Sequence, residues 1–436
     1  MAMIAMILFL AITSVTAGMS LAGVMNENVE HGTPADYSRI VTYIGERSAA
    51  EMNASAQEGG TGYRYALATE PVDVLEASAL DTIDPETPDA RPFDLTSIIG
   101  RSVQLDVYDS TPVGQSVPLV TLDGLCEAVG MPLPAGTESA DVTGLGLGIA
   151  KESDYNRYLR YRGFDEVDLG EDGYLITSDM GASVNDVYNA AMADGVTIDI
   201  AGRTLHPVAD AVDPEASVFQ NAMMGMNSGV VVVPDELVEK AGLPLYWSYF
   251  LGDYADGVST EEGDAYVSAY RRYGDLTDGD GAVVARWGME ATRTSTYESV
   301  DSMNGLISYL AIYIGFVLVV ACAAIVTIQQ LSGVADASGN YRILSELGTE
   351  RRDIAHSVLA QQTVFFVFPL VLGIAHSCVA LSVIIDLVEL FGGFSIGGAV
   401  GFTALIFVVA YGGYFFVTYL MSKGIVGEAV RVRNSH

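Results

Sequence analysis

The chain has 436 residues, of which 50% are hydrophobic, yet its formal net charge is −34. Residues 27–301 carry nearly all of this imbalance, because they hold 15 of the 21 basic residues and 48 of the 55 acidic ones. A surface of this charge repels nucleic acid, which we exclude as a partner, and attracts cations or basic peptides. An acidic bias common to the proteins of the source organism is the explanation that we favour for this charge, since the chain has only three lysines.

The first stretch, residues 1–26, is apolar, and we predict that it forms a first transmembrane helix. No basic residue precedes Arg39, whereas a secretory signal peptide starts with a positively charged region. A helix that stays in the membrane is therefore favoured. Because nothing basic anchors the start of this helix, we also expect that further sequence normally precedes it.

Residues 27–303 form a large domain in which short β-rich runs alternate with helical ones, which predicts an α+β fold. Residues 81–94, rich in proline and acidic residues, predict a surface loop. The predicted strands are residues 103–108, 173–177, 196–200, 230–233 and 282–286, and the predicted short helices are residues 122–128 and 234–241.

Two aromatic segments of this domain have two interpretations each. Residues 152–164 predict a helix whose tyrosines and arginines either stack on a ligand or pack inward and pair with acidic neighbours. The aromatic run at residues 246–254 forms either a peptide-binding surface or part of a core. Packing is the more common role for such residues, and we favour it for both segments.

The last third of the chain contains three further apolar segments, residues 304–329, 355–386 and 394–422. Each exceeds the roughly 20 apolar residues that cross a bilayer. With the first stretch they predict an integral membrane α-helical protein with four transmembrane helices. A short polar joint, residues 330–354, connects the second and third helices, and residues 423–436 form a tail.

The basic residues predict the orientation of these helices. They gather in the joint and in the tail, and basic residues near membrane helices mark the cytoplasmic side. The joint and the tail are therefore expected in the cytoplasm, and the acidic domain outside the membrane. The residues concerned are Arg342, Arg351, Arg352, Lys423, Arg431 and Arg433.

The sequence lacks the patterns of an active site. Its five histidines are scattered, which predicts no metal site, and no Walker A phosphate loop is present. We therefore predict a non-catalytic membrane subunit with no cofactor of its own.

The joint and the helix after it carry a recognisable pattern. Residues 341–354 read YRILSELGTERRDI, followed by Gln361 and Gln362, Pro369 within residues 365–370, and GIAHS at residues 373–377. This pattern resembles that of FtsX-like ABC transporter permeases, and in particular the bacitracin-type (BceB-like) antimicrobial peptide branch. The resemblance covers residues 305–422 and is weaker over the acidic domain.

The resemblance implies an FtsX/MacB-like topology and a partner, a cytoplasmic ABC ATPase that holds ATP-Mg and docks on the joint. The residues implied in docking and force transmission are Tyr341, Arg342, Leu344, Leu347 and Gly348. Gln361, Gln362 and His376 are polar groups at membrane depth, which we expect to face other helices. They act there either as interhelical contacts, which we favour, or as a polar switch.

The function implied is that of a permease subunit in the plasma membrane of a bacterium. It would couple ATP hydrolysis, by mechanical transmission, to movement of the outside domain for antimicrobial peptide export, resistance or target release. The alternatives are a peptide sensor that signals to a histidine kinase, a lipid- or lipoprotein-handling permease, and an activator of cell-wall hydrolases. Since the resembling permeases have ten spans, an upstream permease half or a second copy is a further expected partner, alongside membrane lipid.

Overall fold

The computed structural model describes residues 2–79, 81–83, 91–134, 137, 146–213, 215–218, 227–269, 274–389 and 396–431. It divides into two compact units, which we treat separately. The helical unit comprises Met1–Val24, Ser302–Ile385 and Phe394–His436, and the sheet unit comprises Met25–Asp301 and Asp386–Gly393.

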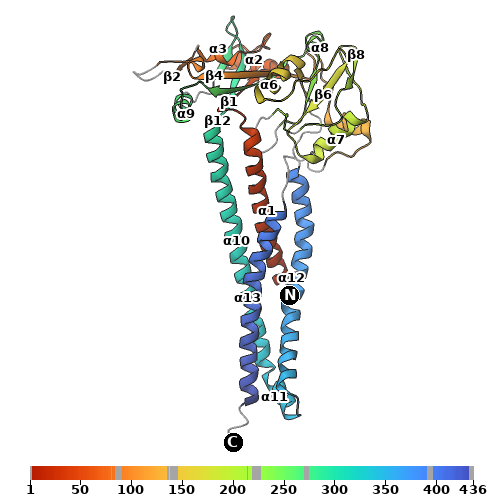
Figure 1. Cartoon of the computed structure of the whole chain (residues 1–436), viewed down its shortest axis with the longest axis vertical. Coiled ribbons are helices and arrows are strands. Elements are labelled where there is room, and N and C mark those ends of the chain that lie inside the picture. The colour runs from red at the N-terminus through yellow and green to blue at the C-terminus, as the bar shows by residue number, and fades with distance from the viewer. Residues whose placement is uncertain are drawn as a thin grey trace. The chain divides into compact units, whose positions relative to one another are not determined.

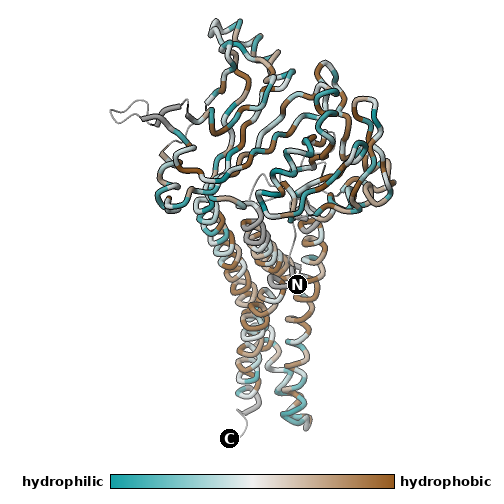
Figure 2. Tube along the Cα trace, turned by 45° about the horizontal axis from the view of Figure 1, so that its top comes forward, coloured by the Kyte–Doolittle hydropathy of each residue, from teal (hydrophilic) through white to brown (hydrophobic). Residues whose placement is uncertain are grey.

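The helical unit is built from long helices. Among the described residues, four of them are long and apolar enough to cross a membrane, as predicted; Figure 2 shows their predominantly hydrophobic colouring. A further helix of this unit, α11, is short and lies in the joint. The bounds are α1 Ala2–Gly32, α10 Arg293–Asp336, α11 Ser338–Glu346, α12 Arg351–Glu389 and α13 Ile396–Arg431.

Several of these helices extend beyond the predicted apolar segments. α10 begins at Arg293, because Thr292 and Ser295 cap its start through reciprocal hydrogen bonds of 3.1 Å between side chain and backbone. α13 continues past residue 422 to Arg431, so much of the predicted tail is helical. The sequence pattern located the apolar part of each helix and missed the polar turns beyond it.

The core of the helical unit joins all four long helices. Leu8 of α1, Val319 of α10, Phe366 of α12 and Tyr411 of α13 are buried in one cluster. At Gly315, an added Cβ would lie 2.1 Å from Cγ2 of Val15, so the glycine allows α1 and α10 to approach closely. Small residues serve this purpose in membrane helices, where close packing holds the bundle together.

The sheet unit, some of whose strands are labelled in Figure 1, contains a ten-stranded sheet of order β11-β12-β1-β10-β4-β5-β9-β6-β8-β7. Within it, β5 pairs with β9 and β6 with β8 in parallel, and the other pairs are antiparallel. The strands are β1 Tyr37–Tyr43, β4 Ile99–Asp109, β5 Gly148–Lys151, β6 Gly173–Thr177, β7 Ile198–Ile200, β8 Arg203–Pro207, β9 Val230–Val233, β10 Leu245–Tyr254, β11 Asp275–Thr277 and β12 Val283–Thr292.

Helices cover both faces of this sheet, and β9 shows why its sequence is continuously apolar. Val231 and Val233 pack in one core with α4, α7 and α8. Val230 and Val232 point the other way, into a second core that contains α6. The helices of the sheet unit are α2 Glu46–Gly59, α3 Val74–Ala79, η1 Leu95–Ser97, α4 Leu122–Val129, α6 Glu152–Arg162, α7 Ala182–Ala193, α8 Asp235–Ala241 and α9 Thr260–Ser268.

Most predicted elements of this unit are confirmed. The strands at residues 173–177 and 230–233 have the predicted bounds, and residues 103–108 lie inside the longer β4. The prediction of a loop at residues 81–94 was wrong for its two described ends. There β2 Asp81–Ile83 and β3 Arg91–Phe93 pair as antiparallel strands. Residues 84–90 lie outside the described part.

The two aromatic segments are largely internal. On α6, Tyr155, Tyr158 and Tyr161 are all buried. The hydroxyl of Tyr158 donates to the carbonyl oxygen of Ser217 at 2.8 Å. The aromatic run at residues 246–254 belongs to β10, where Trp247 is buried and Tyr246 is exposed. Inward packing, the favoured interpretation, therefore holds for most of these side chains.

Candidate functional site

The joint between α10 and α12 consists of α11 and a tight turn. The turn is made by Gly348, whose φ of 93° lies in the left-handed region that favours glycine. The N–H of Gly348 donates to the carbonyl of Ser345, and that of Thr349 to the carbonyl of Leu344. These bonds close the end of α11 and let α12 begin at Arg351.

A small core fixes α11 to the ends of the long helices. Tyr341 is buried there with Val334 of α10, Ile354 and Val358 of α12, and Val426 of α13. Its hydroxyl donates to Oε1 of Gln361 on α12 at 3.1 Å. The structure thus places Tyr341 inside the unit, where it links α11 to the long helices instead of presenting a surface.

Three apolar side chains at the end of α11 are exposed. Leu344 and Leu347 are exposed, Leu347 to 78%, and Ile343 is exposed as well. We call Ile343, Leu344 and Leu347 the joint patch. Arg342 is also exposed and pairs with Glu346 at 3.3 Å. The sequence analysis missed Ile343, although its spacing of four residues from Leu347 places both on one helix face.

The three polar residues expected at membrane depth have different surroundings. Gln362 is fully buried; its Nε2 donates to Oγ of Ser422 and to the carbonyl of Thr418 on α13. Its Oε1 has no hydrogen-bond partner among the described residues. Gln361 is exposed and accepts the bond from Tyr341. An interhelical role therefore fits both glutamines.

His376 was expected to face other helices, and its ring meets one of them, α1, while its side chain is exposed. Its Nδ1 lies 2.8 Å from the carbonyl oxygen of Leu372, one turn earlier in α12. The ring also contacts Phe9 of α1 edge to face, with centroids 6.3 Å apart. The contact with its own helix gives one ring nitrogen a hydrogen-bond partner.

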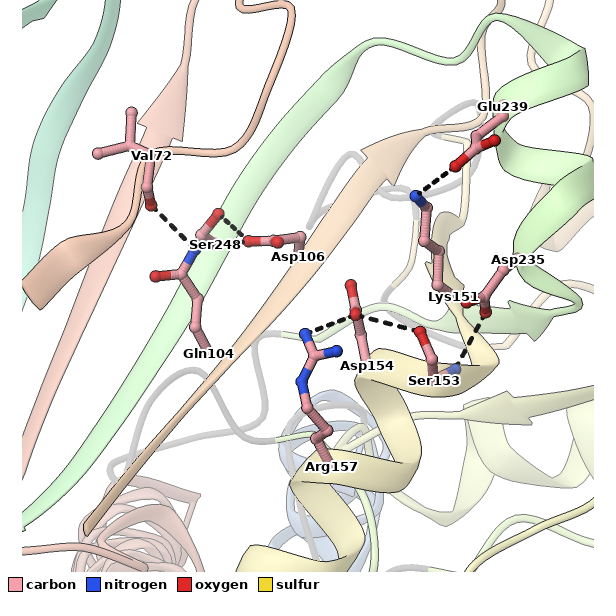
Figure 3. Close-up of polar contacts among 10 residues, drawn as sticks. All are labelled: Val72, Gln104, Asp106, Lys151, Ser153, Asp154, Arg157, Asp235, Glu239 and Ser248. Carbon is pink, nitrogen blue, oxygen red and sulfur yellow. Dashed lines mark hydrogen bonds and ion pairs between the residues drawn. The ribbon is translucent and has the colours of Figure 1, made fainter. Parts of the chain in front are cut away.

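The sheet unit contains a polar cluster that the sequence analysis did not find. Asp106 of β4 and Asp154 of α6 are buried carboxylates within it (Figure 3). Asp106 accepts bonds from Nε2 of Gln104 at 2.9 Å and from the hydroxyl of Ser248 at 2.5 Å. Asp154 pairs with Arg157, one turn along α6, at 2.6 Å. The two acids thus hold side chains of β4, β10 and α6 in fixed positions.

Further ion pairs and hydrogen bonds connect this cluster to α8. The N–H of Ser153 donates to Asp235, and Nζ of Lys151 donates to Glu239 at 3.2 Å. These two bonds join β5 and the start of α6 to α8 (Figure 3). The side chain of Lys151 is only partly exposed.

Burial makes both acids hold their protons more tightly. It raises the pKa of Asp154 to about 6, with Arg157 acting in the opposite direction and Asp106 and Asp235 adding to the rise. Burial likewise raises the pKa of Asp106, against the hydrogen bonds from Ser248 and Gln104. Desolvation disfavours the charged form of a carboxyl group, which is the common cause.

This pKa predicts that the sheet unit loses stability as pH rises from about 4 to about 6. The folded state binds the proton of Asp154 more tightly than the unfolded state does. Between about pH 4 and about pH 6 the folded state keeps this proton and the unfolded state loses it, so folding takes up a proton; above this range neither state holds it. The loss is at most about 3 kcal/mol. Both tryptophans of the chain, Trp247 and Trp287, lie in this unit, so tryptophan fluorescence during urea unfolding reports on it.

The matched variant is Asp154→Asn, which keeps the shape and removes the titrating group. We expect its stability to change less between pH 4.5 and pH 7 than that of the wild type, by about 1–3 kcal/mol. An identical pH dependence in both proteins would show that Asp154 does not titrate differently on folding.

No family model matches the chain. It is similar to the ABC transporter permease protein YxdM of Bacillus subtilis (strain 168), with 28% identity over 91 residues. The aligned part is 21% of this chain and 15% of that protein, so the chain spans a small fraction of the relative's length. The four long apolar helices fit a multi-pass membrane protein, and over the aligned residues the chain is similar to an ABC transporter permease.

Proposed function

We propose that the chain is the permease subunit of an ABC transporter in a bacterial plasma membrane, and that a separate ATPase docks on the joint patch. The observation that carries this proposal is the construction of α11. Three apolar side chains at its end are exposed, while Tyr341 ties the same helix into a core shared with α10, α12 and α13. A force applied to the patch would therefore reach three long helices together.

The physical character of the patch supports a protein partner. An exposed apolar helix face fits a hydrophobic groove of another protein, with anchors spaced three and four residues apart. Ile343, Leu344 and Leu347 have this spacing. Arg342 and Arg351 lie close by in the sequence, and basic residues at such positions favour the cytoplasmic side, where an ATPase and its ATP-Mg would be. Closure of the ATPase would then move the helices and, through α1 and α10, the sheet unit.

The ligand we propose is a membrane-active antimicrobial peptide, handled by export or by release from its target. The acidic charge of residues 27–301 is complementary to the positive charge of a basic peptide. We therefore expect a basic peptide to stimulate ATP hydrolysis by the complex.

The experiment is co-purification. The full chain would be expressed with the ABC ATPases of its own genome, solubilised in mild detergent and captured by an affinity tag. We expect one ATPase to remain bound and its hydrolysis to rise when a basic antimicrobial peptide is added. Capture of a histidine kinase with no ATPase would instead support the alternative function, that of a peptide sensor that signals to the kinase.

A further inference from the structure

Three arginines gather in one groove of the sheet unit, although the unit as a whole is strongly acidic. Arg101 of β4 and Arg157 and Arg160 of α6 line this groove, which has a volume of about 490 Å³. Asp73 is the single acidic residue of its lining among the described residues. The lining thus presents three guanidinium groups and one carboxylate, in a domain that carries most of the net charge of −34.

Each arginine is held in position by a carboxylate and still reaches the solvent. Arg101 donates to Asp253 at 2.8 Å, Arg157 pairs with Asp154 at 2.6 Å, and Arg160 pairs with Glu166 at 3.1 Å. All three side chains remain more than half exposed. A guanidinium has five N–H donors, so a single carboxylate leaves donors for a ligand.

The rest of the lining is rigid and partly apolar. Gln104 is fixed because its Nε2 donates to Val72 and Asp106, and its Oε1 accepts from the N–H of Val74. The ring of Tyr161 lies 4.4 Å beneath the guanidinium of Arg101, and Phe250 adds an apolar wall. A groove of this volume is in the range of small-molecule sites, which combine apolar walls with a few fixed polar groups.

We propose that this groove binds an oxyanion, a phosphate or carboxylate group carried by a small ligand with an apolar part. Arg101, Arg157 and Arg160 contact the oxyanion, and the apolar part lies against Tyr161 and Phe250. Arginine is the residue best suited to such groups, because its planar fork donates two parallel hydrogen bonds. This inference concerns the sheet unit alone and is independent of the partner ATPase.

The experiment uses the full chain in nanodiscs of phosphatidylcholine, titrated by calorimetry with soluble probes. Phenyl phosphate and benzoate are expected to bind, and uncharged benzyl alcohol is not. Arg101→Gln and Arg160→Gln should each weaken binding of phenyl phosphate about tenfold, since each removes a charge-assisted hydrogen bond. Arg286→Gln is the control: it removes an exposed, paired arginine outside the groove and should leave affinity unchanged.

A second set of probes identifies the source of the oxyanion. Dihexanoyl phosphatidate that binds more tightly than phenyl phosphate would point to a lipid headgroup, and weaker binding to a soluble ligand; both results support the site. The proposal would be overturned by the absence of heat with phenyl phosphate and benzoate, by equal binding of benzyl alcohol, or by unchanged affinity in both folded groove variants. Tryptophan fluorescence during thermal unfolding shows whether each variant is folded.

Discussion

Replacing Leu347 by Asp is expected to abolish binding of the partner ATPase while the chain itself still folds. Leu347 is 78% exposed, so its side chain contributes little to the packing of the helical unit. In the docked state the new charge would be buried without a partner, at a cost of several kcal/mol. A cost of about 3 kcal/mol corresponds to about a hundredfold weaker binding, which co-purification and a titration with the isolated ATPase would both detect.

The matched control for Leu347→Asp is Asn340→Asp, which adds the same charge to α11 at an exposed position that is already polar. We expect this variant to keep the ATPase. Retention of the ATPase by Leu347→Asp at wild-type affinity would exclude the joint patch from docking, and equal loss in both variants would show that charge on α11, not the patch, is responsible.

Replacing Glu290 by Ala is expected to destabilise the sheet unit by about 3 kcal/mol. Arg39 of β1 is only 1% exposed and pairs with Glu290, directly opposite on β12, at 3.1 Å. Its guanidinium also lies 4.1 Å above the ring of Trp287 and donates to the hydroxyl of Tyr37. Removing the carboxylate takes a counter-ion away from a buried positive charge, which is the costly step.

Unfolding in urea, followed by tryptophan fluorescence, measures this effect, because Trp287 contacts Arg39. Asp275→Ala provides the control: its carboxylate pairs with Arg286 at 2.9 Å, but both side chains are exposed. Exposed pairs contribute about 0–1 kcal/mol, so this variant should unfold close to the wild type. Equal stability of the two variants would show that the Arg39–Glu290 pair has no special role.

The sequence predicts best where one stretch of chain determines its own surroundings. The membrane helices follow from the length of their apolar runs, and β9 follows from four consecutive valines, since both of its faces are buried. Gly348 marks the end of α11 because the turn needs a positive φ. In each case the decisive information lies within a few neighbouring residues.

The strands β1 and β10 were missed because their sequences do not look like ordinary strands. β1 contains the buried Arg39 among its apolar residues, and its pattern becomes clear only with Glu290 opposite. β10 is aromatic and buried on both faces over most of its length, so it lacks the alternation that marks a half-exposed strand. Both strands depend on partners that are distant in the sequence.

The same limit applies to the candidate sites. Tyr341 and Leu347 lie in the same short motif, but only the packing of α11 against α13 shows that one is buried and the other exposed. Asp106 lies on β4 and Asp154 on α6, with α4 and β5 between them in the sequence, so no local pattern links them. The groove arginines likewise come from β4 and α6.

The most direct test of the proposed docking is site-specific crosslinking in living cells. A photoreactive phenylalanine analogue at position 347, on the joint patch, should form an adduct with an ABC ATPase, and the yield should change with the nucleotide state of that ATPase. The same analogue at Val117, which is exposed in the sheet unit, should give no such adduct. Crosslinks from position 347 to lipid or to other proteins, with the ATPase present and never captured, would contradict the proposal that it docks on the joint.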